Sequence, residues 1–275
     1  MDTFVDSSWY FLRFLSPRDR ERPFDRAIAD RWLPVDQYIG GVEPAILHLM
    51  YSRFFTKVLP DEGLVGFEEP FAALFTQGMI CKDGAKMSKS RGNVVSPEDL
   101  IAQYGADTAR LYTLFIGPPE KDAEWNDRAV EGTYRFLGRL WRLATDHLDA
   151  LPPGAVLGQW PGGEGGEAKG DPAEGLEAVR DLRRITHRTI ERVTQDIDRL
   201  HLNTSVSACM ELTNAAIAFA AQAAAARALA AGRPEGRALK EALEALVLCL
   251  APFAPQDMVT VDTSGGLGLS ELFAS

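Results

Sequence analysis

The sequence predicts an α/β fold in its first part and an all-α fold in its second part. Two observations carry this prediction. Up to about residue 119, short runs typical of strands alternate with runs typical of helices, which is the order expected of a parallel sheet with crossover helices. Beyond that point, apolar residues recur at steps of three and four, as in helices that bury one side.

A short aromatic helix is predicted first, from Ser7 to Leu15. Asp6 can cap its beginning. Ser16 and Pro17 end it, because proline disfavours helical backbone in the residue before it. A polar, arginine-rich stretch follows.

A strand–helix–strand unit is predicted next. Residues 35–39 form the first strand, which runs into Gly40 and Gly41. Pro44 then opens a helix that ends before Pro60, and its apolar residues share one side: Ile46, Leu47, Met50, Phe54 and Val58. Residues 71–80 form the second strand. The two glycines therefore lie at the carboxyl end of a parallel strand, where α/β sheets bind ligands.

Residues 82–93 are predicted to be a loop, because glycines bracket them and they have no apolar period. Ser96, Pro97 and Asp99 then give a capped helix start with a capping box. A second short helix is predicted over residues 106–115, ended by a Gly-Pro-Pro sequence.

Four helices are predicted in the second part, and together they form a bundle. Three of them have a buried stripe: Tyr134, Leu137, Trp141, Ala144 and Leu148; Ile190, Val193, Ile197 and Leu200; Leu239, Leu243, Leu246 and Leu250. The remaining helix, within residues 214–232, is rich in alanine, and Gly232 stops it. Residues 151–175 contain 8 Gly and 4 Pro, so a mobile loop is predicted there.

Composition excludes some classes of protein. The formal charge of -10 rules out a basic coat over the whole chain, so any nucleic-acid contact must be a local patch. Cys81, Cys209 and Cys249 form no CxxC pair, which favours neither a zinc site nor a disulfide framework and fits a reducing cytosol. No secretion signal or apolar span is evident, so a cytoplasmic location without membrane contact is expected.

The most informative motif is the run Lys86-Met87-Ser88-Lys89-Ser90. Its two lysines are three residues apart between flexible glycines, so they can close over a triphosphate and stabilise the charge that develops as pyrophosphate leaves. A lone lysine pair would more often belong to a solvated loop.

This KMSKS run is the second signature of class I aminoacyl-tRNA synthetases, and its surroundings resemble the leucyl-tRNA synthetase family. The resemblance rests on six blocks in order: DTFVDSSWY, LPVDQYIGGVEPAILHLMYSRFF, QGMI, KMSKSRGNVVSP, YGADTARLY and EWNDRAVEGTYRFLGRLW. It covers the chain from residue 1 to about residue 255. It implies the second half of a Rossmann-like catalytic domain, followed by a helical tRNA-binding bundle of the anticodon-binding type.

The resemblance implies a leucine pocket at Ser7, Tyr10 and His48. From the residues alone, a helix cap for Ser7 and core packing for Tyr10 and His48 are the competing explanations. Pro44 departs from the family, which commonly has a second histidine there that faces leucine, so leucine recognition by this chain is left open.

The resemblance also implies an ATP site and the residues that act on ATP. Lys86 and Lys89 would be catalytic. The ATP-binding residues would be Gly40, Gly41, Glu43, Gln77, Ile80, Met87, Ser88 and Lys89. Mg²⁺ is expected to arrive on the ATP phosphates, and no metal held by protein ligands is expected.

Leucine tRNA is the macromolecular partner that the resemblance implies. Residues 104–112 resemble the stem-contact region of the family. Arginines cluster on the first two bundle helices, and those expected to meet tRNA phosphates are Arg135, Arg139, Arg142, Arg184 and Arg188. Solvation and pairing within the helix explain exposed arginines equally well.

Counting histidines identifies an absent signature. The HIGH signature needs two histidines three apart, and the four histidines here never come within ten residues of each other. The chain is therefore expected to lack the HIGH half and the editing domain, and to catalyse poorly without a separate N-terminal half.

The expected domains are residues 1–119, the catalytic part with the stem-contact region; 120–255, the bundle; and 256–275, an atypical tail. A split subunit, an incomplete gene product and a noncatalytic tRNA-binding fragment remain open as explanations of this chain.

Overall fold

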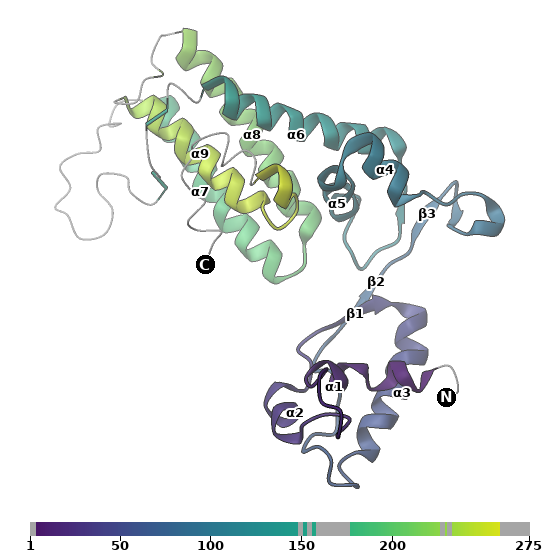
Figure 1. The fold of residues 1–275 in the computed structure, drawn as a ribbon. Helices are drawn as coiled ribbons and strands as arrows, with labels where there is room; N and C mark the ends of the chain where they lie inside the picture. The colour runs from purple at the N-terminus through teal and green to yellow at the C-terminus, as the bar shows by residue number, and fades with distance from the viewer. Residues whose placement is uncertain are drawn as a thin grey trace, which may run out of the picture. The chain divides into compact units, whose positions relative to one another are not determined.

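The computed structural model describes residues 4–147, 151–152, 156–157, 177–225, 229 and 233–258. The chain forms two compact units, shown in Figure 1. The first comprises residues 1–80 with 120–123, and the second comprises residues 81–119 with 124–275. The fold class follows the prediction: small sheets with helices come first, and a helical bundle follows. The domain boundary at residue 119 stays a prediction.

The first unit begins with a 3₁₀ turn, η2 (Asp6–Ser8), and a short helix, α1 (Tyr10–Phe14). The predicted end of this helix is confirmed, but the predicted cap is wrong. Asp6 lies inside the 3₁₀ turn, and the backbone is turned instead by Ser7 and Ser8, whose hydroxyls both donate to the Phe4 carbonyl. Such local hydrogen bonds compete with a regular helix start.

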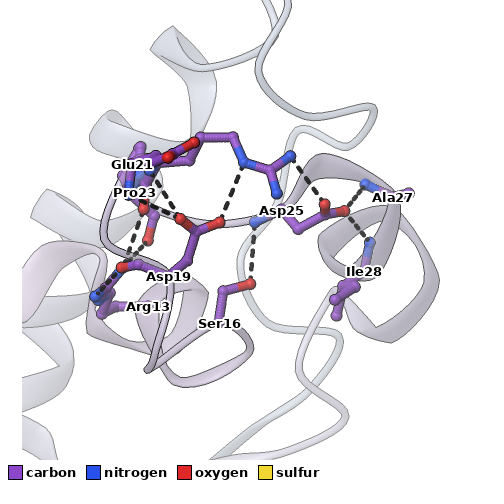
Figure 2. A network of polar contacts seen from close by, with 9 residues as sticks. Arg13, Ser16, Asp19, Glu21, Pro23, Asp25, Ala27 and Ile28 are labelled. Carbon is purple, nitrogen blue, oxygen red and sulfur yellow. Dashed lines mark hydrogen bonds and ion pairs between the residues drawn. The ribbon is translucent and has the colours of Figure 1, made fainter.

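The arginine-rich stretch after α1 is an ordered turn held by side chains (Figure 2). The Arg13 guanidinium donates to four backbone carbonyls, the shortest bond being 2.7 Å to Asp19. The Asp19 carboxylate accepts from the backbone amides of Glu21 and Arg22. These two bonds are the main reason why the pKa of Asp19 is lowered. Asp25 then caps α2 (Arg26–Trp32).

The predicted strand–helix–strand unit is confirmed. It consists of β1 (Tyr38–Gly41), α3 (Val42–Val58) and β2 (Leu74–Gln77), and the two strands are parallel. The first strand begins later than predicted, and only an isolated bridge from Val35 to Phe71 precedes it. α3 begins two residues before Pro44, which the first turn of a helix tolerates because its amides have no partner within the helix.

Residues 82–93 are not the irregular loop that was predicted. β3 (Ile80–Lys82) and β4 (Ala85–Lys86) form an antiparallel hairpin, and η3 (Lys89–Arg91) follows it. Asp83 and Gly84 have φ of 58° and 70°, the pair of left-handed conformations that matches the twist of a two-residue hairpin. β5 (Ala123–Glu124) lies on the other side of β3, in the order β4-β3-β5.

Two short helices follow the hairpin, α4 (Pro97–Tyr104) and α5 (Ala106–Phe115). The predicted cap is confirmed, because Ser96 Oγ accepts from the Asp99 amide at 3.3 Å. The bounds of α5 agree with the prediction. Gly105 separates the two helices with φ of 85°, a backbone conformation that favours glycine.

The bundle consists of α6 (Asp127–His147), α7 (Glu177–Asp198), α8 (Leu202–Ala225) and α9 (Pro234–Leu250). In Figure 1, α7, α8 and α9 lie side by side, and α6 packs on α5 and α8. The predicted stripe of α6 is partly wrong: Tyr134 is 51% exposed, and the core contacts come from Phe136, Leu137, Leu140 and Ala144. The predicted loop, the Gly232 stop and the tail fall mostly outside the described residues.

α9 carries charged residues that are fully buried, Lys240, Glu241 and Glu244. Glu244 accepts hydrogen bonds from the backbone amides of Val156 and Leu157, the latter at 2.6 Å. Lys240 Nζ donates to the Pro152 carbonyl at 2.6 Å. The side chains of Lys240 and Glu244 therefore hold the described parts of the segment between α6 and α7 against α9. Burial raises the pKa of Glu244.

Candidate functional site

The carboxyl ends of β1 and β2 bring several predicted site residues together. In the parallel register, Gly40 lies opposite Thr76 and Gly41 lies opposite Gln77. α3 begins directly after Gly41, and no side chain caps its first turn. A strand end without side chains, next to the uncapped amides of a helix, is the arrangement that nucleotide-binding folds use for close approach of a ligand.

Three further residues of this predicted nucleotide site, Glu43, Gln77 and Ile80, belong to the same unit, whereas Met87, Ser88 and Lys89 belong to the second unit. Gln77 ends β2 with an exposed side chain, and Ile80 begins β3. Glu43 lies in the first turn of α3, and its side chain is outside the described part of the structure.

Gly78 is a positioning residue that sequence reasoning missed. A Cβ at Gly78 would lie 2.2 Å from the carbonyl carbon and oxygen of Lys121. The Met79 amide donates to Asp122 Oδ1 at 2.6 Å, and the Ala123 amide donates to the Met79 carbonyl at 2.9 Å. Residues 120–123 thus pack directly on the strand connection after Gln77. The signal for this contact was the glycine itself, but its partner is more than forty residues away.

Ser7, Tyr10 and His48 lie together in the first unit. His48 Nε2 is 2.6 Å from the Ser7 carbonyl, which can only accept, so Nε2 carries a proton and donates. In the neutral ring, Nδ1 then accepts from the Tyr38 hydroxyl at 2.8 Å. The Tyr10 and His48 rings are 6.0 Å apart between centroids. The structure therefore brings all three predicted leucine-site residues into one cluster.

Tyr38 belongs to the same cluster and was also missed from sequence. Its ring stacks on His48 with centroids 5.6 Å apart, and it contacts Phe71 at 4.6 Å. Burial, with a smaller contribution from Tyr10, raises the pKa of Tyr38, so this hydroxyl stays protonated and available as a donor. The hydroxyl of Ser7 is engaged with the Phe4 carbonyl at 3.2 Å, so its backbone carbonyl, rather than its side chain, holds His48.

The KMSKS motif lies in the second unit, where it continues the β3–β4 hairpin. Lys86 ends β4, and Lys89 begins η3, and both side chains are exposed. Between them, Met87 and Ser88 are half-buried. Gly92 closes the turn with φ of 69°. The two lysines therefore project from a short, ordered element and not from a featureless loop.

Asn93 organises this element and was not singled out from sequence. Its Oδ1 accepts from the Ser88 amide at 2.9 Å. Its amide nitrogen donates to the Lys82 carbonyl at 3.0 Å and lies 3.4 Å from the carbonyls of Ala85 and Lys86. One side chain thus ties both hairpin strands to the middle of the motif. The asparagine was visible in the sequence, but no local periodicity signals such a contact.

The five predicted arginines are all exposed. Three of them lie on α6 and two on α7: Arg135, Arg139, Arg142, Arg184 and Arg188. Arg135 pairs with Glu131 at 3.0 Å, and Arg184 pairs with Asp181 at 2.9 Å. Each pair joins two residues of the same helix and is exposed to solvent, where such ion pairs contribute little to stability. A competing anion could therefore displace the carboxylates at small cost.

The residues that the structure describes contain no cluster of three or more His, Cys, Asp or Glu that could hold a metal ion. Within the same ranges, no helix has the length and apolar character needed to cross a membrane.

Comparison with protein families gives two matches. Residues 1–126 match tRNA synthetases class I (I, L, M and V). Residues 180–256 match the anticodon-binding domain of tRNA ligase. The two matches follow the same order as the α/β part and the bundle.

Among curated proteins, the chain is similar to leucine–tRNA ligases. It is 53% identical over 257 residues to that of Geobacter sp. (strain M21), which covers 93% of this chain and 28% of the relative. It is 52% identical over 259 residues to that of Syntrophobacter fumaroxidans, covering 93% of this chain and 29% of the relative. The chain thus spans less than a third of the length of these relatives.

Among solved structures, the chain is similar to a leucyl-tRNA synthetase from Agrobacterium radiobacter K84, determined as a ternary complex with tRNA and LeuAMS. The TM-score is 0.80 at 38% identity, covering 97% of this chain and 32% of the other. Methionyl-tRNA synthetase from Mycobacterium tuberculosis gives a TM-score of 0.67 at 20% identity, covering 94% of this chain and 48% of the other, a likeness of fold alone.

Proposed function

Since this chain belongs to the leucine–tRNA ligase family of class I tRNA synthetases, we propose that it supplies the KMSKS part of the catalytic site and the tRNA-binding bundle of such a ligase. The observation that carries this proposal is the KMSKS element itself. Both of its lysines are exposed, and the backbone between them is fixed by Asn93. Preorganised cations of this kind stabilise charge that develops in a transition state.

In the proposed reaction, ATP enters as its Mg²⁺ complex. A carboxylate oxygen of leucine attacks the α-phosphorus, the bond from that phosphorus to the bridging oxygen breaks, and pyrophosphate leaves with the electron pair. Lys86 and Lys89 offset the negative charge that builds on the departing phosphates. A ribose hydroxyl of the terminal adenosine of the tRNA then attacks the leucyl carbonyl, the bond from that carbonyl to the phosphate oxygen breaks, and AMP leaves with the hydroxyl proton on its phosphate. Such chemistry depends on positioning and electrostatics and needs no protein nucleophile.

The substrates are assigned to the clusters of the first unit. ATP adenosine lies at Gly40 and Gly41, where a bare strand end permits close approach, with Gln77 opposite in the register. The leucine side chain lies against Tyr10 and His48. Because His48 is oriented at both ring nitrogens, it presents a fixed surface to the ligand.

A complementary polypeptide is part of this proposal, and the outer side of α3 supports it. Six large apolar residues of α3 are 43–63% exposed: Val42, Ile46, Leu47, Met50, Phe54 and Val58. Parallel sheets are normally covered on both faces, and β1 and β2 form a sheet of two strands. Exposed apolar surface of this extent is typical of an interface. A segment that carries the HIGH signature is the proposed cover, encoded either with this chain or separately.

The tRNA is assigned to the exposed arginines of α6 and α7. Phosphate contacts of this kind give affinity that falls steeply with salt and carries little sequence information.

The decisive experiment is leucine-dependent ATP–pyrophosphate exchange with this chain, with and without a separately expressed complementary half. Exchange should appear only in the mixture. Replacing Lys86 and Lys89 together by alanine should abolish it, whereas the matched variant Lys121→Ala, at an exposed lysine outside the motif, should retain it. Activity that survives loss of both motif lysines would contradict the proposed role.

A noncatalytic tRNA-binding module is the second candidate, favoured by the extent of the helical bundle. It predicts tight, salt-sensitive binding of leucine tRNA by this chain alone, together with no exchange in any mixture. Exchange in the reconstituted pair excludes it.

A further inference from the structure

A pocket of about 400 Å³ lies in the second unit, where α4 meets α5 beside α6. Its walls are built from Tyr104 and Gly105, the first turn of α5, one side of α6, and residues 256–258. The volume is at the lower end of the range for small-molecule sites, about 300–1,000 Å³, so it suits a single planar ligand and is too small for a helix. None of the predicted ATP or leucine residues lines it.

One wall of the pocket is aromatic. Tyr104 and Tyr134 lie with ring centroids 5.7 Å apart and planes tilted by 58°, so they form a corner and leave ring faces open. Tyr134 is 51% exposed although it lies on a helix that packs on the core, and Trp141, two turns further along the same side of α6, is half-buried. Exposed aromatic faces in a concave site are platforms on which a flat ring can stack.

Two cations flank this wall on α6. Arg135 and Arg142 both line the pocket and both are exposed. They are seven residues apart, so they share one side of the helix at a spacing of about 10 Å. The Arg135–Glu131 pair faces solvent, so the guanidinium is available to a stronger anion.

Two carboxyl groups, those of Asp107 and Asp257, also line the pocket. Asp107 is 4% exposed, and its Oδ2 accepts from the Asp257 amide at 2.6 Å. Its Oδ1 is buried and has no hydrogen-bond partner among the described residues. A buried carboxylate oxygen without a partner costs free energy, so the side of the pocket that Asp107 lines favours ligands with donors over ligands with acceptors. Asp257 also lines the pocket, and burial, with a smaller contribution from the charge of Asp107, raises its pKa.

A pocket lined by arginines, aromatic rings and carboxyl groups has the combination of groups found in nucleotide sites. On the premise that the chain binds tRNA as proposed above, we infer that this pocket takes one unpaired nucleotide of that tRNA, with an amino-bearing base. The base stacks in the aromatic corner formed by Tyr104 and Tyr134. Its amino group points to the wall formed by Asp107 and Asp257, and its phosphate lies at Arg135 and Arg142.

An amino-bearing base fits the acidic wall better than uracil does. Adenine, cytosine and guanine each carry an exocyclic amino donor, whereas uracil presents carbonyl oxygens at the corresponding edge. Carbonyl oxygens facing two carboxyl groups would add repulsion. RNA is commonly read in this way, through splayed single bases that stack and hydrogen-bond at their edges.

Gly138 allows the pocket to be filled without disturbing its polar residues. It lines the pocket on α6, and a Cβ there would meet no atom within 4 Å. Gly132 is the matched control, because it lies on the same helix with the same free space and outside the pocket lining. Gly138→Leu and Gly132→Leu therefore change helix propensity equally, and only the first inserts a side chain where the base would stack.

The experiment measures binding of leucine tRNA to the full chain by fluorescence anisotropy, for the wild type and both variants, with melting temperatures recorded in parallel. Gly138→Leu should weaken binding about tenfold, as expected for loss of one stacked base, and Gly132→Leu should stay within about twofold. Cytidine monophosphate should bind the wild type more tightly than uridine monophosphate, by a margin that Gly138→Leu removes.

The outcomes separate the two proposals. Equal tRNA binding by all three proteins overturns the pocket assignment and leaves the proposed function standing. If Gly138→Leu lowers the melting temperature but leaves tRNA binding unchanged, the pocket assignment is also overturned. The new side chain then competes with a segment of the protein itself and not with a nucleotide. Equal binding of the two monophosphates overturns the role of the acidic wall. No tRNA binding by any of the proteins overturns the proposed tRNA contact, and this assignment with it.

Discussion

The backbone amide of Ser88 donates a 2.9 Å hydrogen bond to Oδ1 of Asn93, five residues later in the chain. The same side chain bonds the Lys82 carbonyl at 3.0 Å. Asn93 thus fixes the centre of the KMSKS motif to the hairpin that precedes it. The side-chain amide of Asn93 therefore contributes strongly to the order of this element.

Asn93→Ala should loosen the motif without unfolding the chain. Each lost hydrogen bond is worth about 1 kcal/mol, so exchange of the Ser88 amide with deuterium should become at least about tenfold faster. Asn93→Asp keeps the acceptor for Ser88 and loses the donors to the hairpin carbonyls, so its effect should be intermediate. Asn126→Ala, at the asparagine whose side chain accepts from the first amides of α6, is the control. Unchanged exchange at Ser88 in Asn93→Ala would contradict this account.

Gly78→Ala should destabilise the first unit, because the new methyl group would overlap the Lys121 backbone at 2.2 Å. Moving a backbone segment away costs about 1–3 kcal/mol. At Gly40 a methyl group would meet the Tyr38 ring at 3.7 Å, which is an ordinary contact, so Gly40→Ala should leave the free energy of unfolding nearly unchanged. Urea denaturation followed by fluorescence compares the two variants, and equal stability of Gly78→Ala and wild type would refute the clash.

Tyr38→Phe should lower the free energy of unfolding by about 1 kcal/mol, because it removes the donor to His48 Nδ1. His48→Phe should cost more, since it leaves the Ser7 carbonyl and the Tyr38 hydroxyl without their partner. In the reconstituted exchange assay, His48→Gln should raise the KM for leucine more than the KM for ATP. Equal changes in the two KM values would indicate that His48 acts only in packing.

Glu69 makes the first unit sensitive to acid. Arg53 donates two 2.7 Å hydrogen bonds to its carboxylate, and this pairing, with help from Lys57, lowers the pKa of Glu69 to about 2. The pKa in the folded state is below the ordinary value of 4.5, so this stabilisation is fully present above pH 4.5 and is lost as the pH falls towards 2. The pair is nearly half exposed, so its contribution should be at most about 1 kcal/mol. Arg53→Met should flatten the stability curve over that range, and an unchanged slope would contradict the assignment.

Glu244→Leu should destabilise the second unit by about 3 kcal/mol, because it leaves the buried amides of Val156 and Leu157 without their acceptor. Burial raises the pKa of Glu244, so folding favours the protonated carboxyl group over the ionised one. The associated stability is complete below the ordinary pKa and decreases as the pH rises through the raised value. Glu244→Gln should remove this pH dependence and cost less than Glu244→Leu. Thermal unfolding between pH 4 and 8 provides the measurement.

The elements with local signals were predictable from the sequence. The capping serine before Pro97 indicated the start of α4, and the Gly-Pro-Pro sequence indicated the end of α5, both at their observed positions. The hairpin was missed although its signal was present: Asp83-Gly84 is a strong marker of a two-residue hairpin turn, and Gly84 was interpreted only as a loop boundary.

Long-range contacts were not predictable in this way. The apolar period of α3 identified one side of the helix, but periodicity does not tell whether the same chain covers that side, and here it is exposed. Tyr134 was expected in the core because aromatic residues at helical spacing usually lie there, and it lines a pocket instead. Gly78 contacts a segment that is distant in the sequence, and Asn93 contacts the hairpin that folds back beside it. The identity of a single residue does not indicate which of these contacts it makes.

The small size of the β1–β2 sheet has a consequence for the life of the protein in a cell. Four paired residues on each strand and a modest apolar cluster hold the first unit, whereas the helical unit has the larger core. Segments with little buried surface open most often, and opened segments are where proteases cut. We therefore expect the lifetime of the uncovered chain to be set by its first eighty residues, and any polypeptide that covers α3 to act as its protector against degradation as well as its catalytic complement.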